Sequence, residues 1–300
     1  MKVLGVTPLY PPMSRVGAWL ATHRCLRRMV ERGHEVHVRT TFAPLGYALD
    51  GIDVLGRWDR CIDGYDVVVS HHGDTVSAVK GLCDRQRVPH VLMVHGPSDG
   101  VDGSSLTVWN SHSSRAGRDG IVVRPHVDPD EYRCRPGDAI TLVNLSPEKG
   151  GEVFRLLAPS MHDKQFLAVR GGYGRQARVV GLNVETIPTT QDMVGDVYAR
   201  TRVLLMPSET ETWGRTGIEA MCSGIPVIAH PTPGLRESLG DAGIFVDRSD
   251  LAGWIAAIRD LDDPERYAAA SAAASARAAE VCAQTAADLD LFAELLEGCA

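Results

Sequence analysis

Short apolar runs, separated by stretches with helical periodicity, repeat along almost the whole chain. The runs are rich in Val and apolar at consecutive positions, which is typical of strands buried on both faces of a parallel sheet. In the first half we expect strands at residues 2–7, 35–40, 51–57, 66–70, 90–95 and 106–110. In the second half we expect strands at residues 139–145, 165–171, 184–190, 202–208, 225–231 and 243–247.

Helices are predicted between these strands. Residues 14–32 carry an apolar stripe and end at Gly33, a residue typical of helix C-termini. Further helical segments are expected at 150–158, 192–200 and 215–223, with an Ala-rich helix over 264–296. Strands that alternate with helices indicate βαβ units and a doubly wound sheet. The pattern therefore predicts an α/β protein with two Rossmann-like domains that face each other across a cleft.

Composition narrows the class of protein. The chain has 300 residues, of which 44% are hydrophobic and 23% are charged, and its mean hydropathy is −0.09. No apolar run reaches the roughly 18 residues of a membrane-spanning helix, and the N-terminal apolar run is too short for a signal peptide. Seven cysteines without a C-x-x-C pair argue against a disulfide framework and a structural zinc site. We therefore expect a cytoplasmic protein.

The net charge of −7 is unevenly distributed. Residues 1–125 contain 15 Lys and Arg against 12 Asp and Glu, whereas residues 126–300 contain 16 against 26. The acidic total argues against non-specific binding of nucleic acid by the whole chain. Arg24, Arg27, Arg28 and Arg32 nevertheless line one face of the first predicted helix. This basic stripe is either a solvated face or a surface for an anionic lipid, a phosphorylated small molecule or a nucleic-acid backbone.

The stretch richest in candidate functional residues is 203–230, VLLMPSETETWGRTGIEAMCSGIPVIAH. A predicted strand ends there in a polar loop with Glu211, and a helix begins after Gly214 and carries Glu219. Ligands of doubly wound sheets bind beyond the carboxyl ends of the strands, and a helix start at that edge attracts anions. The stretch therefore predicts a ligand site.

The segment PSETETWGRTGIEAMCSGIPVIA resembles the E-x7-E signature of retaining glycosyltransferases of the GT-B fold, family 4 or group 1. Three companions occur in the order that the family shows. They are ERGHEV (31–36), HVLMVHG (90–96) with WNSHS (109–113), and LVNLSPEKGG (142–151). A lone E-x7-E would be a weak signal, but the extended stretch with its companions covers most of the chain and is specific.

The resemblance implies a domain for the acceptor over residues 1–125 and a domain for a nucleotide-sugar donor over 126–284. The last helix, 285–300, would cross back to the first domain. Glu211 and His95 would act at the reacting centre, Glu211 beside the donor sugar and His95 from the first domain. His95 read alone is as well explained as a structural residue at a strand end.

The resemblance also implies a set of donor-binding residues. Lys149 would neutralise the diphosphate, Glu219 would bind the ribose hydroxyls, and Gly17 would let the backbone approach the ligand closely. The backbone amides of Gly214, Arg215 and Thr216 would add to the neutralisation of the diphosphate.

The chain departs from the family at Asn144, where an Arg that contacts phosphate is usual. We expect Asn144 to lie in the donor site and either Arg170 or Arg215 to supply the missing contact.

The chemistry of glycosyl transfer suits these residue types. The transition state resembles an oxocarbenium ion, and negative charge grows on the departing diphosphate. Amides, a helix start and Lys149 stabilise that charge, so no metal and no cofactor is required. The expected activity is that of a retaining hexosyltransferase or other glycosyltransferase with a UDP-sugar or a GDP-sugar as donor.

The sequence leaves the exact activity, the acceptor and the location of the protein open. A nucleotide-sugar epimerase or a sugar phosphorylase of the same fold is an alternative, as is a non-catalytic nucleotide-sugar-binding protein. The acceptor is not identified beyond the anionic classes named above. The protein would be either free in the cytoplasm or peripheral at a membrane.

Overall fold

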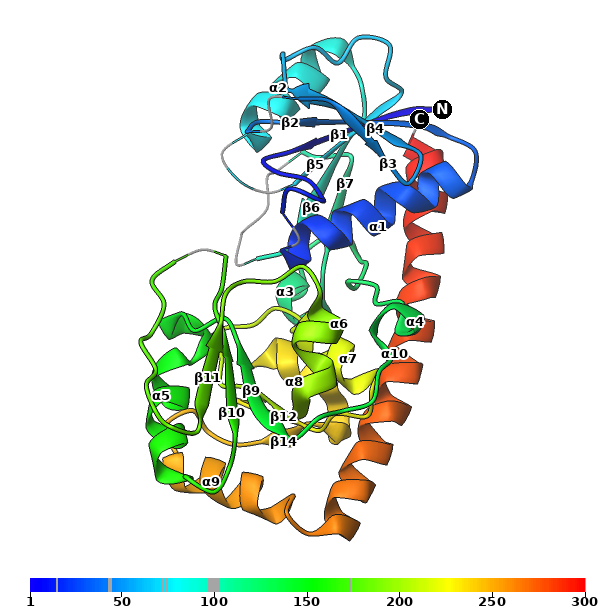
Figure 1. Cartoon of the computed structure of the whole chain (residues 1–300). Helices are drawn as coiled ribbons and strands as arrows, with labels where there is room; N and C mark the ends of the chain where they lie inside the picture. Colours follow the sequence, from blue (N-terminus) through cyan, green and yellow to red (C-terminus); the bar gives the residue numbers. More distant parts are fainter. Residues whose placement is uncertain are drawn as a thin grey trace. The chain divides into compact units, whose positions relative to one another are not determined.

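The computed structural model describes residues 1–14, 16–42, 45–71, 73, 75–96, 103–172 and 174–299. The chain divides into two compact units. Unit 1 comprises Met1–His126 together with Gln284–Ala300, and unit 2 comprises Val127–Ala283. Each unit has its own sheet, and the long helix α10 (Pro264–Cys299) contributes residues to both units (Figure 1).

The strands of unit 1 form one sheet in the order β3-β4-β2-β1-β5-β6-β7-β8. Their bounds are β1 Lys2–Thr7, β2 Glu35–Thr40, β3 Tyr47–Leu49, β4 Ile52–Arg57, β5 Val67–His71, β6 His90–Val94, β7 Leu106–Trp109 and β8 Ile121–Val122. Strand β3 is antiparallel to β4, and the other described neighbours are parallel. The helices of this part are α1 Gly17–Glu31, α2 Val76–Gln86 and α3 His112–Arg115.

Both faces of this sheet are buried, as the apolar runs predict. Val67 and Val69 pack in one core cluster with α1 and the end of α10. Val68 packs on the opposite face, in a second cluster to which Val79 of α2 belongs. Successive side chains of a strand point to opposite faces, so a strand with helices on both sides needs apolar residues at consecutive positions.

The basic stripe of α1 is largely paired with acidic side chains of the same unit. The Arg27 guanidinium lies 3.0 Å from a Glu31 carboxylate oxygen. Arg28 pairs with Asp290 at 3.3 Å, and Arg32 pairs with Glu297 at 2.8 Å. The Arg28 and Arg32 pairs attach the C-terminal end of α1 to the end of α10, where Phe292 and Leu296 complete the core of unit 1. The stripe therefore serves the packing of the fold.

The strands of unit 2 form a parallel sheet in the order β11-β10-β9-β12-β13-β14. Their bounds are β9 Ala139–Val143, β10 Phe166–Val169, β11 Val184–Ile187, β12 Thr201–Met206, β13 Val227–Ala229 and β14 Ile244–Phe245. The helices are α4 Pro129–Tyr132, α5 Gly151–Ser160, α6 Met193–Asp196, α7 Arg215–Met221, α8 Pro233–Leu239 and α9 Leu251–Asp260. Three short 3-10 turns are η1 Pro147–Lys149, η2 Tyr198–Arg200 and η3 Gly240–Ala242.

Helices cover both faces of this sheet as well. Phe154 of α5 and Trp254 of α9 belong to the cluster on one face. Ile218 of α7, Leu235 of α8 and Ala278 of α10 belong to the cluster on the other face. Among the described residues no helix is both long enough and apolar enough to cross a membrane.

The predicted strands are all present, with β3 and β8 in addition, and the α/β class with two sheets, parallel except for β3, is confirmed. The helix expected at 192–200 is instead the short α6 followed by the turn η2. Helices α2, α8 and α9 are not among the helices that the pattern predicts. For α8, Thr232 before Pro233 is nevertheless a helix-start signal. Segment ends are less certain from local patterns because caps and tertiary contacts set them.

At the carboxyl edge of the unit 2 sheet, the loops after β9 and β12 pack so closely that a Cβ at Gly150 would not fit. Gly150 follows η1 and has a φ of 90°, in the left-handed region that favours glycine. A Cβ at this position would lie 2.2 Å from Cγ of Pro207, the residue that follows β12. Strands β9 and β12 are neighbours in the sheet, so their following loops meet here.

We expect Gly150→Ala to destabilise the protein. The left-handed backbone and the overlap with Pro207 together should lower the free energy of unfolding by about 2–4 kcal/mol. Gly174→Ala is the matched control, because Gly174 also has a positive φ of 73° but has no atom within 4 Å of an added Cβ. The control should lose only about 1 kcal/mol in urea unfolding followed by circular dichroism. Equal losses in the two variants would contradict the close contact.

Candidate functional site

The predicted residues of unit 2 gather around the carboxyl edge of its sheet. Lys149 ends the turn η1 after β9, and Glu211 lies in the loop between β12 and α7. The Lys149 ammonium forms an ion pair with Oε2 of Glu211. The two side chains are 28% and 16% exposed, so the pair is open to solvent on one side. Residues 62 positions apart are joined because β9 and β12 are adjacent.

The backbone of Glu211 is held by the start of α8. Thr232 caps this helix, since its hydroxyl accepts a hydrogen bond from the amide of Leu235 at 3.2 Å. The first turn of α8 lies against the loop: a Cβ on Gly234 would be 2.2 Å from the Glu211 carbonyl oxygen. A glycine is required at this close approach. Helix α8 thereby limits where the Glu211 side chain can lie.

Glu219 sits inside a buried polar network on α7. One carboxylate oxygen accepts a hydrogen bond from the Tyr198 hydroxyl at 2.5 Å, and the other lies 3.3 Å from Nε of Arg215. Arg215 also donates to the Tyr132 hydroxyl at 3.0 Å. Burial raises the pKa of Tyr198 well above its usual value, so the phenol keeps its proton and donates a hydrogen bond to Glu219.

Burial opposes the charge of Arg215 most strongly, but the Glu219 carboxylate, Tyr132 and Tyr198 together outweigh it, and the pKa of the guanidinium is raised. The other predicted residues of this helix start are Gly214, which precedes α7, and Thr216, which is half-buried in its first turn. No sequence motif surrounds Tyr198 or Tyr132, so their contacts with Glu219 and Arg215 could not be predicted from the sequence.

Asn144 stabilises the loop after β9 through hydrogen bonds of its side chain. Its φ is 71°, a conformation that Asn tolerates better than most residues. Its side-chain oxygen accepts hydrogen bonds from the amide of Ser146 and from the side chain of Gln176, both at 3.1 Å. Gln176 in turn accepts from the amides of Leu145 at 3.0 Å and Gly171 at 2.8 Å. The loops after β9 and β10 are thereby tied together.

The two arginines expected to compensate for Asn144 have different environments. Arg215 is 8% exposed and belongs to the Glu219 network. Arg170 follows β10 and is exposed. A ligand arriving from solvent therefore reaches Arg170 more easily, and a phosphate contact by either residue stays a prediction.

The predicted residues of unit 1 lie at the carboxyl edge of its own sheet. His95 follows β6, and its ring stacks on the His71 ring with centroids 5.1 Å apart and planes 16° apart. Its Nε2 lies 3.4 Å from the Thr22 hydroxyl on α1. Gly17 is the first residue of α1, and Trp19 of the same helix packs on His71 at 4.4 Å between centroids.

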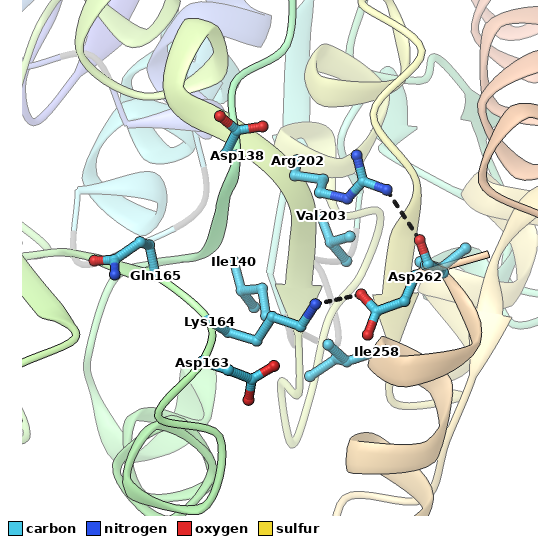
Figure 2. A pocket seen from close by; sticks show the side chains of 10 residues that line it. Asp138, Ile140, Asp163, Lys164, Gln165, Arg202, Val203, Ile258 and Asp262 are labelled. Carbon is cyan, nitrogen blue, oxygen red and sulfur yellow. Dashed lines mark hydrogen bonds and ion pairs between the residues drawn. The ribbon is translucent and has the colours of Figure 1, made fainter. Parts of the chain in front are cut away.

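A cavity of about 310 Å³ lies at the opposite edge of the unit 2 sheet, where β9 and β12 begin (Figure 2). Its lining residues are Asp138, Ile140, Asp163, Lys164, Gln165, Arg202, Val203, Ile258, Leu261 and Asp262. Lys164 pairs with Asp262, and Arg202 donates to the Leu261 carbonyl at 3.0 Å (Figure 2). None of the residues predicted for the site lines this cavity.

Comparison with known proteins shows which family part of the chain resembles. Residues 140–263 match the family model of glycosyl transferases group 1. A D-inositol 3-phosphate glycosyltransferase of Thermobispora bispora is 36% identical over 115 residues, which cover 37% of this chain and 27% of the relative. The enzyme of the same name from Mycolicibacterium smegmatis is 32% identical over 254 residues, covering 71% of this chain and 58% of the relative.

A solved structure extends the likeness of fold over both units. The crystal structure of Anabaena HepE in complex with UDP-glucose has a TM-score of 0.77 at 15% identity. The match covers 99% of this chain and 100% of HepE. The chain spans only about a quarter of the length of the Thermobispora relative, so the likeness concerns family and fold. By its sequence match, the segment of residues 140–263 belongs to the group 1 glycosyltransferases, and the chain has the GT-B fold.

Proposed function

We propose that the chain transfers a sugar from a nucleotide-sugar donor to an acceptor with retention of anomeric configuration and without a metal. The observation that carries this proposal is the Lys149–Glu211 ion pair at the carboxyl edge of the unit 2 sheet, together with the buried Glu219 on the following helix α7. The names of the relatives and the UDP-glucose bound in HepE support a nucleotide-sugar donor.

Lys149 would act on the departing diphosphate. In the ligand-free protein its charge is balanced by Glu211. A diphosphate brings more negative charge than one carboxylate, so it would take over Lys149 and leave Glu211 to face the sugar ring. The attraction between Lys149 and the diphosphate grows as the glycosidic bond breaks, because the leaving group gains charge in the transition state.

The configuration is retained because the acceptor oxygen attacks the anomeric carbon from the same face from which the diphosphate departs. The bond from the anomeric carbon to the phosphate oxygen breaks while the bond to the acceptor oxygen forms. The acceptor proton passes to the departing phosphate oxygen. Glu211 would stabilise the positive charge on the ring without forming a covalent bond, and His95 would serve the reacting centre from unit 1.

Glu219 would hold the nucleotide ribose. Each of its oxygens already has one partner, Tyr198 or Arg215. An ionised carboxylate has about four acceptor positions, so lone pairs stay available for two ribose hydroxyls. The amides of Gly214, Arg215 and Thr216, together with Asn144 and Gly17, complete the proposed donor site.

The acceptor is proposed to be a phosphorylated small molecule. The relatives are named for D-inositol 3-phosphate, which belongs to this class. The arginines of α1 are less suited to a lipid surface or nucleic acid, since Arg27, Arg28 and Arg32 have acidic partners. A cytoplasmic location, with or without membrane association, stays a prediction.

A ligand panel tests the donor. We expect one sugar among UDP-, GDP-, ADP- and dTDP-sugars to raise the melting temperature, because a ligand at 100 times its Kd stabilises by about 2.7 kcal/mol. The donor found in this way is then incubated with D-inositol 3-phosphate, and the product is examined by NMR. An α-linked product from an α-linked donor is expected. Conversion without acceptor would indicate an epimerase, and binding without any turnover would indicate a sensor.

Lys149→Met tests the diphosphate contact. Loss of a charge-assisted contact should weaken UDP affinity by about 10-fold to 100-fold in calorimetry. Lys164→Met is the matched control, because Lys164 is 24% exposed and also pairs with a carboxylate, Asp262, but at the other edge of the sheet. The control should bind UDP like the unmodified protein. Equal affinity of both variants would refute the role of Lys149.

Glu211→Gln separates binding from catalysis. Removing the carboxylate frees Lys149 and lowers repulsion of the diphosphate, so UDP should bind about fivefold more tightly, the equivalent of about 1 kcal/mol for a partly exposed pair. Turnover should fall at least about 100-fold, because the charge on the sugar ring loses its partner. Asp262→Asn is the control and should change neither quantity. A parallel loss of UDP affinity and turnover would mean that Glu211 only maintains the loop.

A further inference from the structure

Arg248 joins several loops at the carboxyl edge of the unit 2 sheet. It lies between β14 and α9, and its side chain is 24% exposed. One guanidinium nitrogen, Nη2, donates to the carbonyl oxygen of Pro147. The other, Nη1, lies 3.2 Å from Oε2 of Glu209 in the loop after β12. The amide of Arg248 also donates to Nδ1 of His230, after β13, at 3.0 Å.

The Pro147 carbonyl belongs to the short turn that presents Lys149. Three backbone hydrogen bonds close this turn: the amides of Lys149 and Gly151 donate to the Ser146 carbonyl at 3.1 and 3.0 Å, and the amide of Gly150 donates to the Pro147 carbonyl at 3.0 Å. The Arg248 guanidinium binds the same carbonyl as the amide of Gly150. A 3-10 turn of three residues with only these local hydrogen bonds has little stability of its own, so its position depends on outside contacts.

A second contact runs parallel to the first. The amide of Glu209 donates to the carbonyl oxygen of Glu148 at 2.8 Å. Arg248 therefore holds both sides of the junction, the turn through Pro147 and the facing loop through the Glu209 carboxylate. Lys149 extends from one side and Glu211 from the other.

We propose that Arg248 is a positioning residue that holds the Pro147–Lys149 turn where Lys149 meets the diphosphate of the donor. The proposal rests on the proposed function of Lys149. Arg248 acts through the turn and does not itself touch the donor. Its planar guanidinium suits this role, because it binds a carbonyl and a carboxylate at once in fixed directions.

A double-mutant cycle tests this assignment, with UDP as the probe in calorimetry. Arg248→Gln should weaken UDP binding about fivefold or more when Lys149 is present. The same substitution should change affinity by less than about twofold when combined with Lys149→Met, because residues that act through one contact are not additive. Equal factors in both backgrounds would overturn the proposal.

Hydrogen exchange of the ligand-free protein provides an independent readout. The amides of Lys149, Gly150 and Glu209 should exchange roughly tenfold faster in Arg248→Gln, because the turn opens more often. Arg259→Gln is the matched control, since Arg259 belongs to α9 and pairs with Asp163. It should leave both UDP affinity and these amides unchanged.

The outcomes separate this inference from the function on which it rests. An unmodified protein that binds none of UDP, GDP, ADP and dTDP would overturn both. An unmodified protein that binds UDP, with unchanged affinity in Arg248→Gln, would overturn only the positioning role. Unchanged exchange of the three amides would do the same, whatever the affinity.

Discussion

Close backbone contact at the carboxyl edge of the unit 2 sheet is the constraint on which the proposed site depends. Gly150 lies against Pro207, and Gly234 lies against the carbonyl of Glu211. These contacts bring the loops after β9 and β12 and the start of α8 within a few atoms of one another. A parallel sheet directs the ends of all its strands to one edge, but only small residues allow the loops to approach this closely.

The charges at this edge fall into two groups with different surroundings. Glu219 is 5% exposed, and its oxygens are held by Tyr198 and Arg215. Such a buried carboxylate must keep its partners, since an unpaired charge in the interior is very costly. Lys149 and Glu211 are partly exposed, so their pairing is weak enough for a ligand to replace. The first group gives a rigid frame, and the second offers charges that can change partners.

Much of the fold and part of the site could be predicted from sequence. The strands were recognisable because burial on both faces requires apolar residues at consecutive positions, as in VVVS before His71. The loop with Glu211 and the turn with Lys149 could be recognised because short motifs mark them. The roles of Tyr132 and Arg248 could not be predicted from sequence, because their partners Arg215 and Pro147 are 83 and 101 positions away. Neither residue type is unusual in a loop or a short helix.

By itself the sequence determined the alternation of strands and helices and the residues that carry charge at the strand ends, since both follow from local patterns. The tertiary structure decided which charges meet. Lys149 contacts Glu211 because β9 and β12 are neighbours in the sheet, an order that no local pattern contains. Arg28 and Arg32 pair with Asp290 and Glu297 of α10 for the same reason: contact depends on how distant segments pack, and packing is a property of the whole fold.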